Sequence, residues 1–420
     1  MAGRLEVKID ATADYTSKTL ITGLTPGTEY GFSIGARRGR FKTPSSDTKK
    51  VNFVFGSCLG GQGFGRNLAD HPDGEGFPIM SAMLNYKPDF FYCNGDWIYA
   101  DETIHPASPQ DYNKDRTSFI PPGMDNLPAA IDLDSFRNRY KYNLEEPQLA
   151  SFLASTPMWN TADDHEIRND YGGKKMEQNK EEADIYHAGI QAFFEFWPLQ
   201  GPPEEPKRLY RSASWGPNVD LFVLDTRSYR AVHVNEDDDD DKPQMAYILG
   251  AEQMKWLSEG LQNSKATWKF IGCSIPLSYK TGHMDSDGWS DGNTDTTSGA
   301  ENEVFTLLEQ IHTNQITGVV FLSGDVHHPF CHSYDPFHTG EPLFYEIAST
   351  PFQALCLPVT EVDMSFNPTV LYAEGELGGE KYFNFGHVTI DEDGNLAFNV
   401  RDKKGASMFE LNLPAPSMAN

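Results

Sequence analysis

The chain has 420 residues, of which 39% are hydrophobic and 12% aromatic. This is enough apolar material for one large domain with an appendage or for two ordinary domains, and it argues against disorder as the main state. The formal net charge of −27 argues against a nucleic-acid partner, because phosphate backbones attract surfaces with an excess of Lys and Arg. Divalent cations suit such an acidic surface.

Membrane and disulfide signals are missing from the sequence. No run of 18 apolar residues occurs, and the N-terminal MAGRLEVKID lacks the apolar stretch of a signal peptide, so we expect no membrane segment. The five cysteines stand apart without CxxC spacing, which predicts neither a zinc ribbon nor a dense disulfide framework. The sequence does not indicate an oligomeric state.

The first 46 residues read as a small β unit. Short alternating segments in residues 5–43 (LEVKI, KTLITGL, EYGFSIGAR and GRFKT) are separated by the turn-like TPGTE. Alternation between apolar and polar residues is typical of half-buried strands, so we expect a few antiparallel strands here. The unit is too short for a complete sandwich.

From residue 51 onward, short apolar runs end abruptly in polar residues. These runs are VNFVFGSC, PDFFYCNGD, TPMWNTADDHE, VDLFVLDTR, WKFIGCS and GVVFLSGDVHH. Each has the pattern of a strand buried on both faces. Two apolar sets with helical spacing lie between them: Ile190, Phe193, Phe194 and Trp197, and Val304, Leu307, Leu308 and Ile311. Strands that alternate with helices predict a layered α/β core.

Two further segments have a readable composition. The tail carries GHVTIDEDGNLAFNV, a predicted hairpin that adds strands at a sheet edge. Residues 237–241 are five consecutive aspartates, which we interpret as a solvated loop because like charges resist packing. Calcium capture by this run is the alternative.

Chemically active side chains gather where the predicted strands end. In open α/β sheets, ligands bind beyond the carboxyl ends of the strands, where the loops converge. Taken singly, each of these side chains has an ordinary explanation as a small buried group, a turn residue or a cap. Together, unpaired like charges in one cleft would be strongly unfavourable, and bound cations would remove the conflict. The residues are Cys58, Asp96, Asp164, Asp225 and Asp325.

Local spacing sharpens this interpretation. GDWIY sets Asp96 three residues before Tyr99, and GDVHH sets Asp325 two residues before His327. A carboxylate oxygen can bridge two ions, whereas a phenolate or thiolate suits a strongly Lewis-acidic ion such as ferric iron.

Six motifs in order resemble the PhoD-like alkaline phosphatase/phosphodiesterase family of the calcineurin-like metallophosphoesterase superfamily. They are FGSC at 55–58, NGDWIY at 94–99, DDHE at 163–166, LDTRSYR at 224–230, QMKWL at 253–257 and SGDVH at 323–327. The segments GLTPGTEY and GRFKTP resemble the end of the family's N-terminal fibronectin-like β unit. The resemblance therefore implies a partial β unit at residues 1–46 and a catalytic domain at residues 47–420.

The resemblance also implies a fold and an activity. The expected fold has four layers, with two mixed β-sheets flanked by helices and metals at the strand ends. The expected cofactors are Fe³⁺ and one or two Ca²⁺, with other divalent ions such as Mn²⁺ as alternatives. The expected reaction is hydrolysis of phosphate mono- or diesters in phosphate acquisition, in an extracellular or periplasmic location.

Metal ligands follow from the resemblance position by position. Asp96 would bridge the iron site to a second site, which Asp164 and Asp325 would complete. After the fifth strand, where many relatives in the superfamily place a metal-binding His, this chain reads GCSIPL. The second site is therefore richer in oxygen, which favours Ca²⁺ over Zn²⁺. The iron ligands would be Cys58, Asp96, Tyr99 and His327.

Two residues are expected to act on the substrate. Arg227 would clamp the phosphoryl oxygens. Asp225 and Arg230 either are structural, pairing with each other or with Arg227 to fix its guanidinium, or act directly on the substrate. His165 would protonate the leaving oxygen or steady the transition state. Glu166 or Asp163 would orient its imidazole; the alternative is a histidine near the metals without a proton role.

Other interpretations remain open at this stage. A phospholipase-D-like diesterase on the same scaffold is one, although the chain has no amphipathic basic helix for membranes. A metal- or phosphate-binding protein without turnover is another. Loops such as residues 282–299 would set substrate size. His328 and His332 lie near the GDVH motif, and His387 is predicted as an edge-strand side chain or a ligand.

Overall fold

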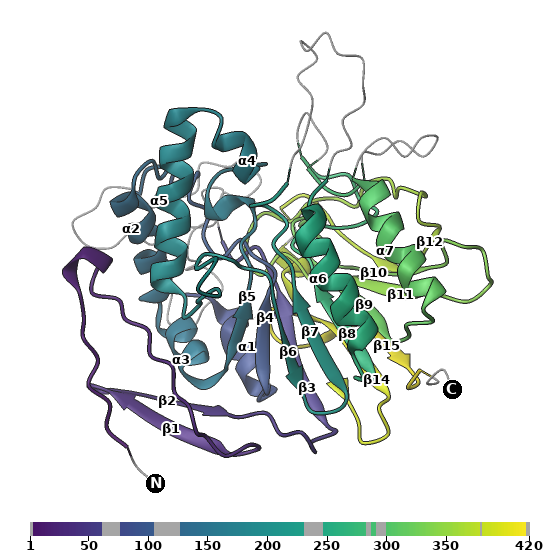
Figure 1. The fold of residues 1–420 in the computed structure, drawn as a ribbon, viewed down its shortest axis with the longest axis horizontal. Coiled ribbons are helices and arrows are strands. Elements are labelled where there is room, and N and C mark those ends of the chain that lie inside the picture. Colours follow the sequence, from purple (N-terminus) through teal and green to yellow (C-terminus); the bar gives the residue numbers. More distant parts are fainter. Residues whose placement is uncertain are drawn as a thin grey trace.

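The structure is a computed structural model that describes residues 3–60, 76–104, 127–230, 247–282, 287–290, 300–378 and 380–416. Two large β-sheets lie face to face in the middle of the molecule (Figure 1). The strand order of one is β12 (Pro368–Ala373), β10 (Phe330–Tyr334), β11 (Phe344–Ala348), β9 (Val319–Ser323), β8 (Trp268–Gly272), β7 (Val219–Val223) and β6 (Arg211–Trp215). The order of the other is β15 (Ser407–Leu413), β14 (Leu396–Asp402), β13 (Asn384–Ile390), β3 (Val51–Gly56), β4 (Phe90–Cys93) and β5 (Met158–Asn160).

Helices cover the outer faces of both sheets (Figure 1). On the side of the six-stranded sheet lie α1 (Pro78–Asn85), α2 (Leu133–Leu144), α3 (Pro147–Ser155) and α5 (Lys180–Phe196), with the short α4 (Gly173–Met176) nearby. On the side of the seven-stranded sheet lie α6 (Gly250–Asn263) and α7 (Glu301–Thr313). The molecule thus has the predicted four layers of helix, sheet, sheet and helix.

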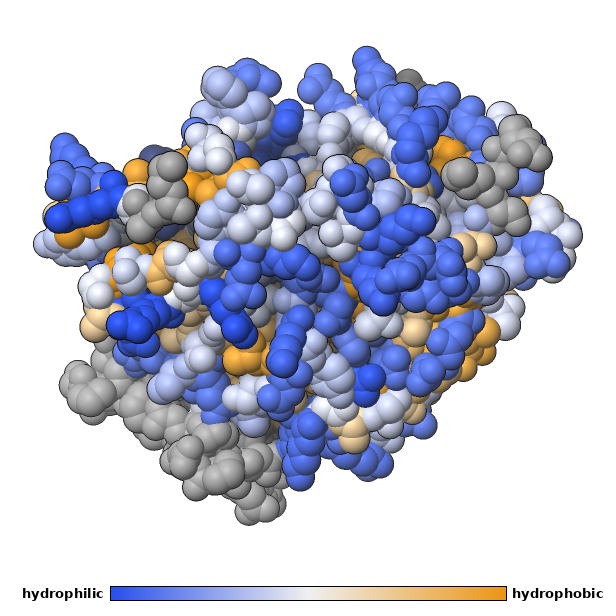
Figure 2. Space-filling view, turned by 90° about the horizontal axis from the view of Figure 1, so that it is seen from below, coloured by the Kyte–Doolittle hydropathy of each residue, from blue (hydrophilic) through white to orange (hydrophobic). Residues whose placement is uncertain are grey.

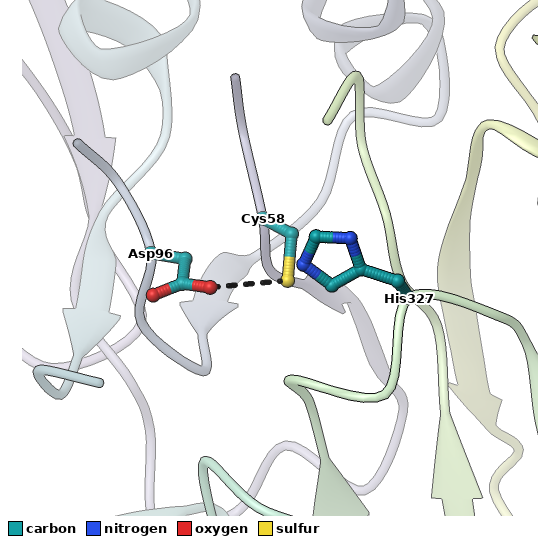
Figure 3. A group of neighbouring side chains, drawn as sticks. All are labelled: Cys58, Asp96 and His327. Atoms are coloured by element: carbon teal, nitrogen blue, oxygen red, sulfur yellow. Dashed lines mark hydrogen bonds between the residues drawn. The ribbon is translucent and has the colours of Figure 1, made fainter. Parts of the chain in front are cut away.

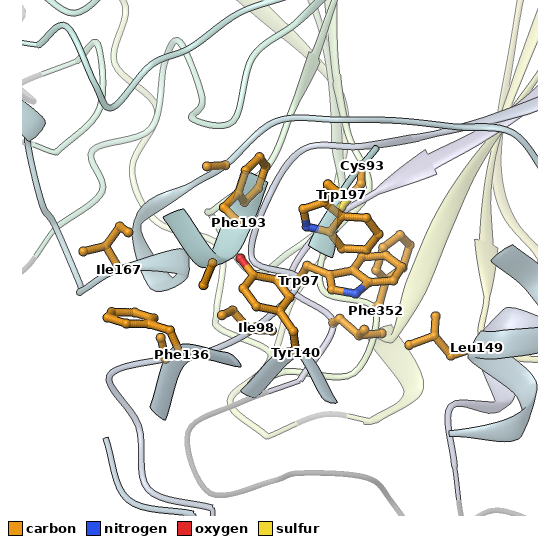
Figure 4. Packing of buried hydrophobic residues seen from close by; sticks show 14 of the residues in the cluster. Cys93, Trp97, Ile98, Phe136, Tyr140, Leu149, Ile167, Phe193, Trp197 and Phe352 are labelled. Atoms are coloured by element: carbon orange, nitrogen blue, oxygen red, sulfur yellow. The ribbon is translucent and has the colours of Figure 1, made fainter. Parts of the chain in front are cut away.

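Apolar side chains fill the space between the layers. Between the sheets, Phe53 on β3 meets Phe270 on β8 edge to face, with ring centroids 5.0 Å apart. Both helical patterns predicted from the sequence are confirmed as α5 and α7, whose apolar residues are buried; Trp197 of the first pattern is buried directly after the end of α5. Trp97 packs against Trp197 beneath the six-stranded sheet, with ring centroids 5.2 Å apart (Figure 4). This packing anchors the loop that follows β4.

The parallel strands position the site. In the six-stranded sheet, β3, β4 and β5 pair in parallel, as do β7, β8, β9 and β11 in the seven-stranded sheet. The carboxyl ends of parallel strands meet at one edge of a sheet, so the loops after them converge. All six predicted strand runs are confirmed as β3, β4, β5, β7, β8 and β9.

The N-terminal unit departs from the prediction. Within the described residues it contains one antiparallel hairpin, β1 (Glu29–Ile34) with β2 (Arg37–Lys42), while residues 5–9 and 18–24 form no strand. Leu5 and Leu20 are 61% and 89% exposed, so the alternating pattern there has no apolar surface or neighbouring strand to pair with. The division at residue 46 stays a prediction.

The C-terminal hairpin predicted from the sequence is present, and one face of the molecule is largely hydrophilic. The predicted hairpin is β13 with β14, which extends the six-stranded sheet beyond β3. Hydrophilic residues dominate the face seen from below (Figure 2), in keeping with the net charge of −27. The aspartate run at residues 237–241 lies outside the described residues.

Among the described helices, none has the length and apolar character that a membrane crossing requires.

Candidate metal centre

The predicted ligands converge at the carboxyl ends of four strands. Cys58 follows β3, Asp96 follows β4, Asp164 follows β5, and Asp325 and His327 follow β9. One group of candidate ligand atoms comes from Cys58, Asp96 and His327, and all its atoms lie within 4.8 Å of one another (Figure 3). A second group, equally close, comes from Asp96, Asp163, Asp164 and Asp325. Asp96 belongs to both groups, as a bridging ligand would.

The first group also includes the phenol of Tyr99. The Cys58 thiol donates to Asp96 Oδ2 at 3.4 Å, and the Tyr99 hydroxyl donates to the same oxygen at 3.2 Å. Tyr99 Oη lies 3.0 Å from His327 Nε2. All four side chains are at least 96% buried. The structure therefore brings a thiol, a carboxylate, a phenol and an imidazole to one point inside the protein.

Four of the residues at the site have a left-handed backbone conformation, which sets the direction of their side chains. Cys58, Asp96, Asp325 and His327 have φ values of 58°, 55°, 62° and 55°. A non-glycine residue in this left-handed region costs roughly 1–2 kcal/mol. Such strain persists where the surrounding structure dictates it, and it clusters at functional sites. In the loop after β4, Trp97 and Ile98 enter the core (Figure 4). The hydrogen bond from Tyr99 to Asp96 keeps the other two side chains of this loop together at the site.

The negative charges of the clustered carboxylates are only partly neutralised by the positively charged side chains near them. Burial, and then the neighbouring acidic groups, raise the pKa values of Asp96 and Asp325 well above their usual range. Burial also raises the pKa of the Cys58 thiol to about 12. Asp325 Oδ2 is buried without a hydrogen-bond partner among the described residues. Metal cations fit this donor set, because they would satisfy the free oxygen and offset the repulsion.

Arg227 is buried between carboxylates beside the second group. Its Nε donates to Asp163 Oδ1 at 2.6 Å, and its Nη1 donates to Asp287 Oδ1 at 2.7 Å. Its Nη2 lies 3.7 Å from Asp164 Oδ1 and makes no hydrogen bond within the described parts of the chain. Burial disfavours the Asp164 carboxylate, but the charges of Arg227 and His165 outweigh it and lower its pKa. One end of the guanidinium therefore remains available at the metal centre.

Asp225 and Arg230, the two charged residues near Arg227 in sequence, do not pair with each other as predicted. Asp225 makes no ion pair with a guanidinium of the described residues; its Oδ1 accepts from the backbone N–H groups of Arg227 and Ser228 at 3.1 and 2.9 Å. Arg230 Nη1 instead donates to Asp287, at 2.5 Å to Oδ1 and 2.9 Å to the carbonyl oxygen. The carboxylate of Asp225 is two residues from Arg227, so it can reach the backbone of its own turn, whereas Asp287 approaches both guanidinium groups from another loop.

His165 is oriented by a residue that the sequence did not single out. Its Nδ1 lies 2.7 Å from Asp101 Oδ1, and its ring stacks on Tyr99 with centroids 4.1 Å apart. Burial opposes protonation of His165, but the charges of Asp164 and Asp101 prevail and raise its pKa well above the usual value. Asp101 Oδ2 accepts from the Asn169 backbone N–H at 2.7 Å, so the carboxylate is held in place.

The prediction that Glu166 or Asp163 orients His165 is wrong. Glu166 accepts from the backbone N–H groups of Asp96, Trp97 and Asp163 at 3.0, 2.6 and 2.7 Å. Its two oxygens therefore join the loop after β4 to the loop after β5. Asp163 in turn accepts from Arg227.

Comparison with known proteins gives the family. A family model described as PhoD-like phosphatase matches residues 53–399. The chain belongs to this family. Alkaline phosphatase D of Bacillus subtilis (strain 168) is 28% identical over 304 residues, which are 69% of this chain and 48% of that protein. The chain thus spans about half the length of that curated relative.

Two solved structures share the fold of this PhoD-like phosphatase family member. One, described as the structure of PhoD, aligns with a TM-score of 0.69 at 22% identity and covers 93% of this chain and 75% of that one. The purple acid phosphatase PPD1 from yellow lupin seeds aligns with a TM-score of 0.57 at 12% identity, over 94% and 61% of the chains. Both likenesses support the predicted metallophosphoesterase architecture.

Two carboxylates of this family member were missed by sequence reasoning. Asp101 lies five residues after Asp96, and that spacing is the only signal that could have pointed to it. Asp287 lies in a segment with several aspartates, and no local pattern distinguishes it.

Of the predicted substrate loop at 282–299, only residues 282 and 287–290 are described. Asp164, Asp170 and Asp287 form a further group with oxygens within 4.8 Å of one another.

The family motif around Gln253 has a structural explanation. Gln253 on α6 accepts from the Asp225 backbone N–H and donates to its carbonyl oxygen, both at 2.8 Å. This side chain therefore fixes the turn that carries Arg227. Asp163 also accepts from Ser274, which stands in the GCSIPL segment, at 2.7 Å.

His328, His332 and His387, which the sequence also singled out, belong to none of the groups of candidate ligand atoms found in the described residues. His387 is on β13, which lies inside the six-stranded sheet, so the edge-strand prediction is wrong. It contacts Asn52 Oδ1 at 2.8 Å and accepts from Arg401 at 3.1 Å. His328 and His332 are buried, and burial lowers their pKa values to about 4 and about 3.

Proposed function

We propose that this chain is a metal-dependent hydrolase of phosphate mono- or diesters. The observation that supports this most strongly is the close group of the buried Asp96, Asp163 and Asp164 with the partly buried Asp325, whose charges call for cations. Arg227 contributes a free guanidinium nitrogen beside it, as binding of a phosphoryl group requires. An extracellular or periplasmic location stays a prediction from the family resemblance.

Two kinds of metal are proposed. Fe³⁺ suits the first group, because thiolate and phenolate ligands stabilise a strongly Lewis-acidic ion. Ca²⁺, as one ion or two, suits the carboxylates of Asp96, Asp164 and Asp325, which offer oxygen ligands only. Mn²⁺ is the alternative divalent ion at that position. The proposed iron ligands are Cys58, Asp96, Tyr99 and His327.

The chemistry is proposed to proceed without a covalent protein intermediate. When bound, the metal ions lower the pKa of the attacking water and stabilise charge on the phosphoryl group. Arg227 Nη2 donates to a phosphoryl oxygen, while its Nε and Nη1 stay on Asp163 and Asp287. His165 donates its Nε2 proton to the leaving oxygen, because its Nδ1 is engaged with Asp101. Arg230 would support Arg227 through their shared partner Asp287.

A paired assay tests this proposal. The purified protein, with its metals measured by elemental analysis, is given p-nitrophenyl phosphate and, separately, its bis ester. We expect hydrolysis of at least one ester, and a loss of about 100-fold or more in Asp164→Asn. Asp335→Asn is the matched control, because that carboxylate accepts hydrogen bonds from Thr339 and Gly340 in an exposed turn. Metal-containing protein that hydrolyses neither ester contradicts the proposal.

A further inference from the structure

Glu346 is a buried carboxylate on β11, an inner strand of the seven-stranded sheet that pairs with β9. Its Oε1 accepts from the Leu277 backbone N–H at 2.8 Å and from the Ser323 hydroxyl at 2.7 Å. Its Oε2 accepts from the Tyr334 hydroxyl. Three donors from three separate segments thus meet on one carboxylate, and within the described residues none of its hydrogen bonds goes to a proposed metal ligand.

The donors lie on segments that carry the site. Ser323 is the last residue of β9 and comes two residues before Asp325. Its carbonyl oxygen accepts from Asn94 Nδ2 at 2.9 Å, and Asn94 precedes Asp96 in the loop after β4. Glu346 is therefore linked through Ser323 to two of the ligand-bearing loops.

The second donor leads to another part of the site. Leu277 belongs to the segment that follows β8, and Ser274 in the same segment donates to Asp163 Oδ1 at 2.7 Å. Asp163 is the carboxylate that holds Arg227. Glu346 thus also restrains the segment that positions the guanidinium.

Close packing around Gly324 couples the segments that Glu346 restrains to the other loops of the site. A Cβ atom at Gly324 would lie 2.7 Å from Ser57 Oγ, 2.8 Å from the Ser274 carbonyl oxygen and 3.1 Å from Asn94 Cβ. The segments after β3, β4, β8 and β9 therefore meet at Gly324 without spare room. A shift of Ser323 or Leu277 would be passed to the neighbouring loops, because closely packed atoms cannot move independently.

A carboxylate at this position needs a reason. Its neighbours Phe344 and Ile347 on β11 are fully buried hydrophobic residues, and an apolar side chain would avoid the cost of burying a polar group. We propose that Glu346 is a positioning residue, which holds the segments after β8 and β9 together so that Asp325 and Asp163 face the metal centre. This inference rests on the proposed function for its catalytic consequence.

Two variants of Glu346 test the inference. Glu346→Ala leaves three buried donors without their acceptor, and we expect kcat to fall roughly 10- to 100-fold with KM little changed, as for residues that orient metal ligands. Glu346→Gln keeps an acceptor oxygen for Leu277 and Ser323, so it should recover most of the loss. Metal release into excess EGTA should be faster in Glu346→Ala by a similar factor, and amide hydrogen exchange in residues 272–279 should rise.

Glu195 on α5 provides the matched control. Its carboxylate also accepts three hydrogen bonds, from Arg137 Nε and Nη2 at 2.7 and 2.8 Å and from Gln191 Nε2 at 2.9 Å. Glu195→Ala should lower stability while leaving kcat and metal release unchanged. If Glu346→Ala does not fold, Ser323→Ala and Tyr334→Phe each remove one donor and should move the same measurements in the same direction.

The outcomes separate the two proposals. A folded Glu346→Ala with wild-type kcat, metal release and exchange overturns the positioning role, as does a Glu195→Ala variant with the same defects as Glu346→Ala. Wild-type protein that binds metal but hydrolyses no phosphate ester refutes the proposed function alone, because metal release and hydrogen exchange still decide the role of Glu346.

Discussion

Asp101→Asn is the sharpest perturbation of the proposed proton donor. The Asp101 carboxylate has two engagements, with His165 Nδ1 at 2.7 Å and with the Asn169 backbone N–H at 2.7 Å. Both partners need an acceptor when the imidazole is protonated. An asparagine has one acceptor oxygen and one NH₂ group, so either orientation of the amide loses one of these bonds. The asparagine side chain has nearly the same shape as the aspartate, but it cannot accept both hydrogen bonds.

The size of the effect follows from this geometry. A hydrogen bond to a charged group contributes about 1.5–3 kcal/mol, and 1.36 kcal/mol corresponds to a tenfold change in rate. We therefore expect kcat of Asp101→Asn to fall about 10- to 150-fold. Metal content should stay the same, because Asp101 belongs to none of the groups of candidate ligand atoms within the described residues.

The assay compares two leaving groups. A proton donor matters little for p-nitrophenolate, which leaves readily as an anion, and much more for an alkoxide. The loss in Asp101→Asn should therefore be larger with an alkyl phosphate ester than with the matching p-nitrophenyl ester. Glu195→Gln is the matched control, since it weakens the Arg137 ion pair, 2.7 Å long, away from the site. Equal losses for both leaving groups, or no loss, would refute the role given to His165.

Three other predictions follow from the same structure. Cys58→Ser should remove any visible charge-transfer absorption of a thiolate–iron pair and lower activity; a variant that keeps both colour and rate removes Cys58 from the metal site. Excess EGTA should inactivate the enzyme and added Ca²⁺ should restore it, whereas full activity in EGTA rejects a calcium role. Burial raises the pKa of Glu346 to about 7. The hydrogen bonds from Tyr334, Ser323 and Leu277 lower this pKa, but the effect of burial is larger. The folded state therefore binds the proton more tightly, so the free energy of unfolding should fall by up to about 3 kcal/mol as pH rises from about 4.5 to about 7. The nearby acidic groups stay neutral in this range because their pKa values are raised; they are Cys273, Tyr279, Cys331 and Tyr334. Urea unfolding across this range should show a flatter pH dependence in Glu346→Gln, and an unchanged slope would contradict the assignment.

The sequence alone determined the layered core and the ligand-bearing strand ends. Strands such as β3 and β9 are buried on both faces, so they appear as continuous apolar runs that stop where the chain reaches the site. Cys58 and Asp325 follow directly along the chain, and chain connectivity therefore predicts their place. The alternating residues 5–9 show the limit of this reasoning, because a strand also requires a partner, and a local pattern cannot say whether one exists.

Only the tertiary structure decided which residues support the site. His165 meets Asp101 from 64 residues away, Arg227 meets Asp287 from 60, and Leu277 meets Glu346 from 69. Each pair joins segments that belong to different strands of one sheet, and the order of the strands in a sheet is a property of the whole chain. A carboxylate carries no local signal of the partner it will meet. The strand ends that carry the proposed ligands were therefore predictable from the sequence, whereas the residues that orient these side chains became visible only in the folded molecule.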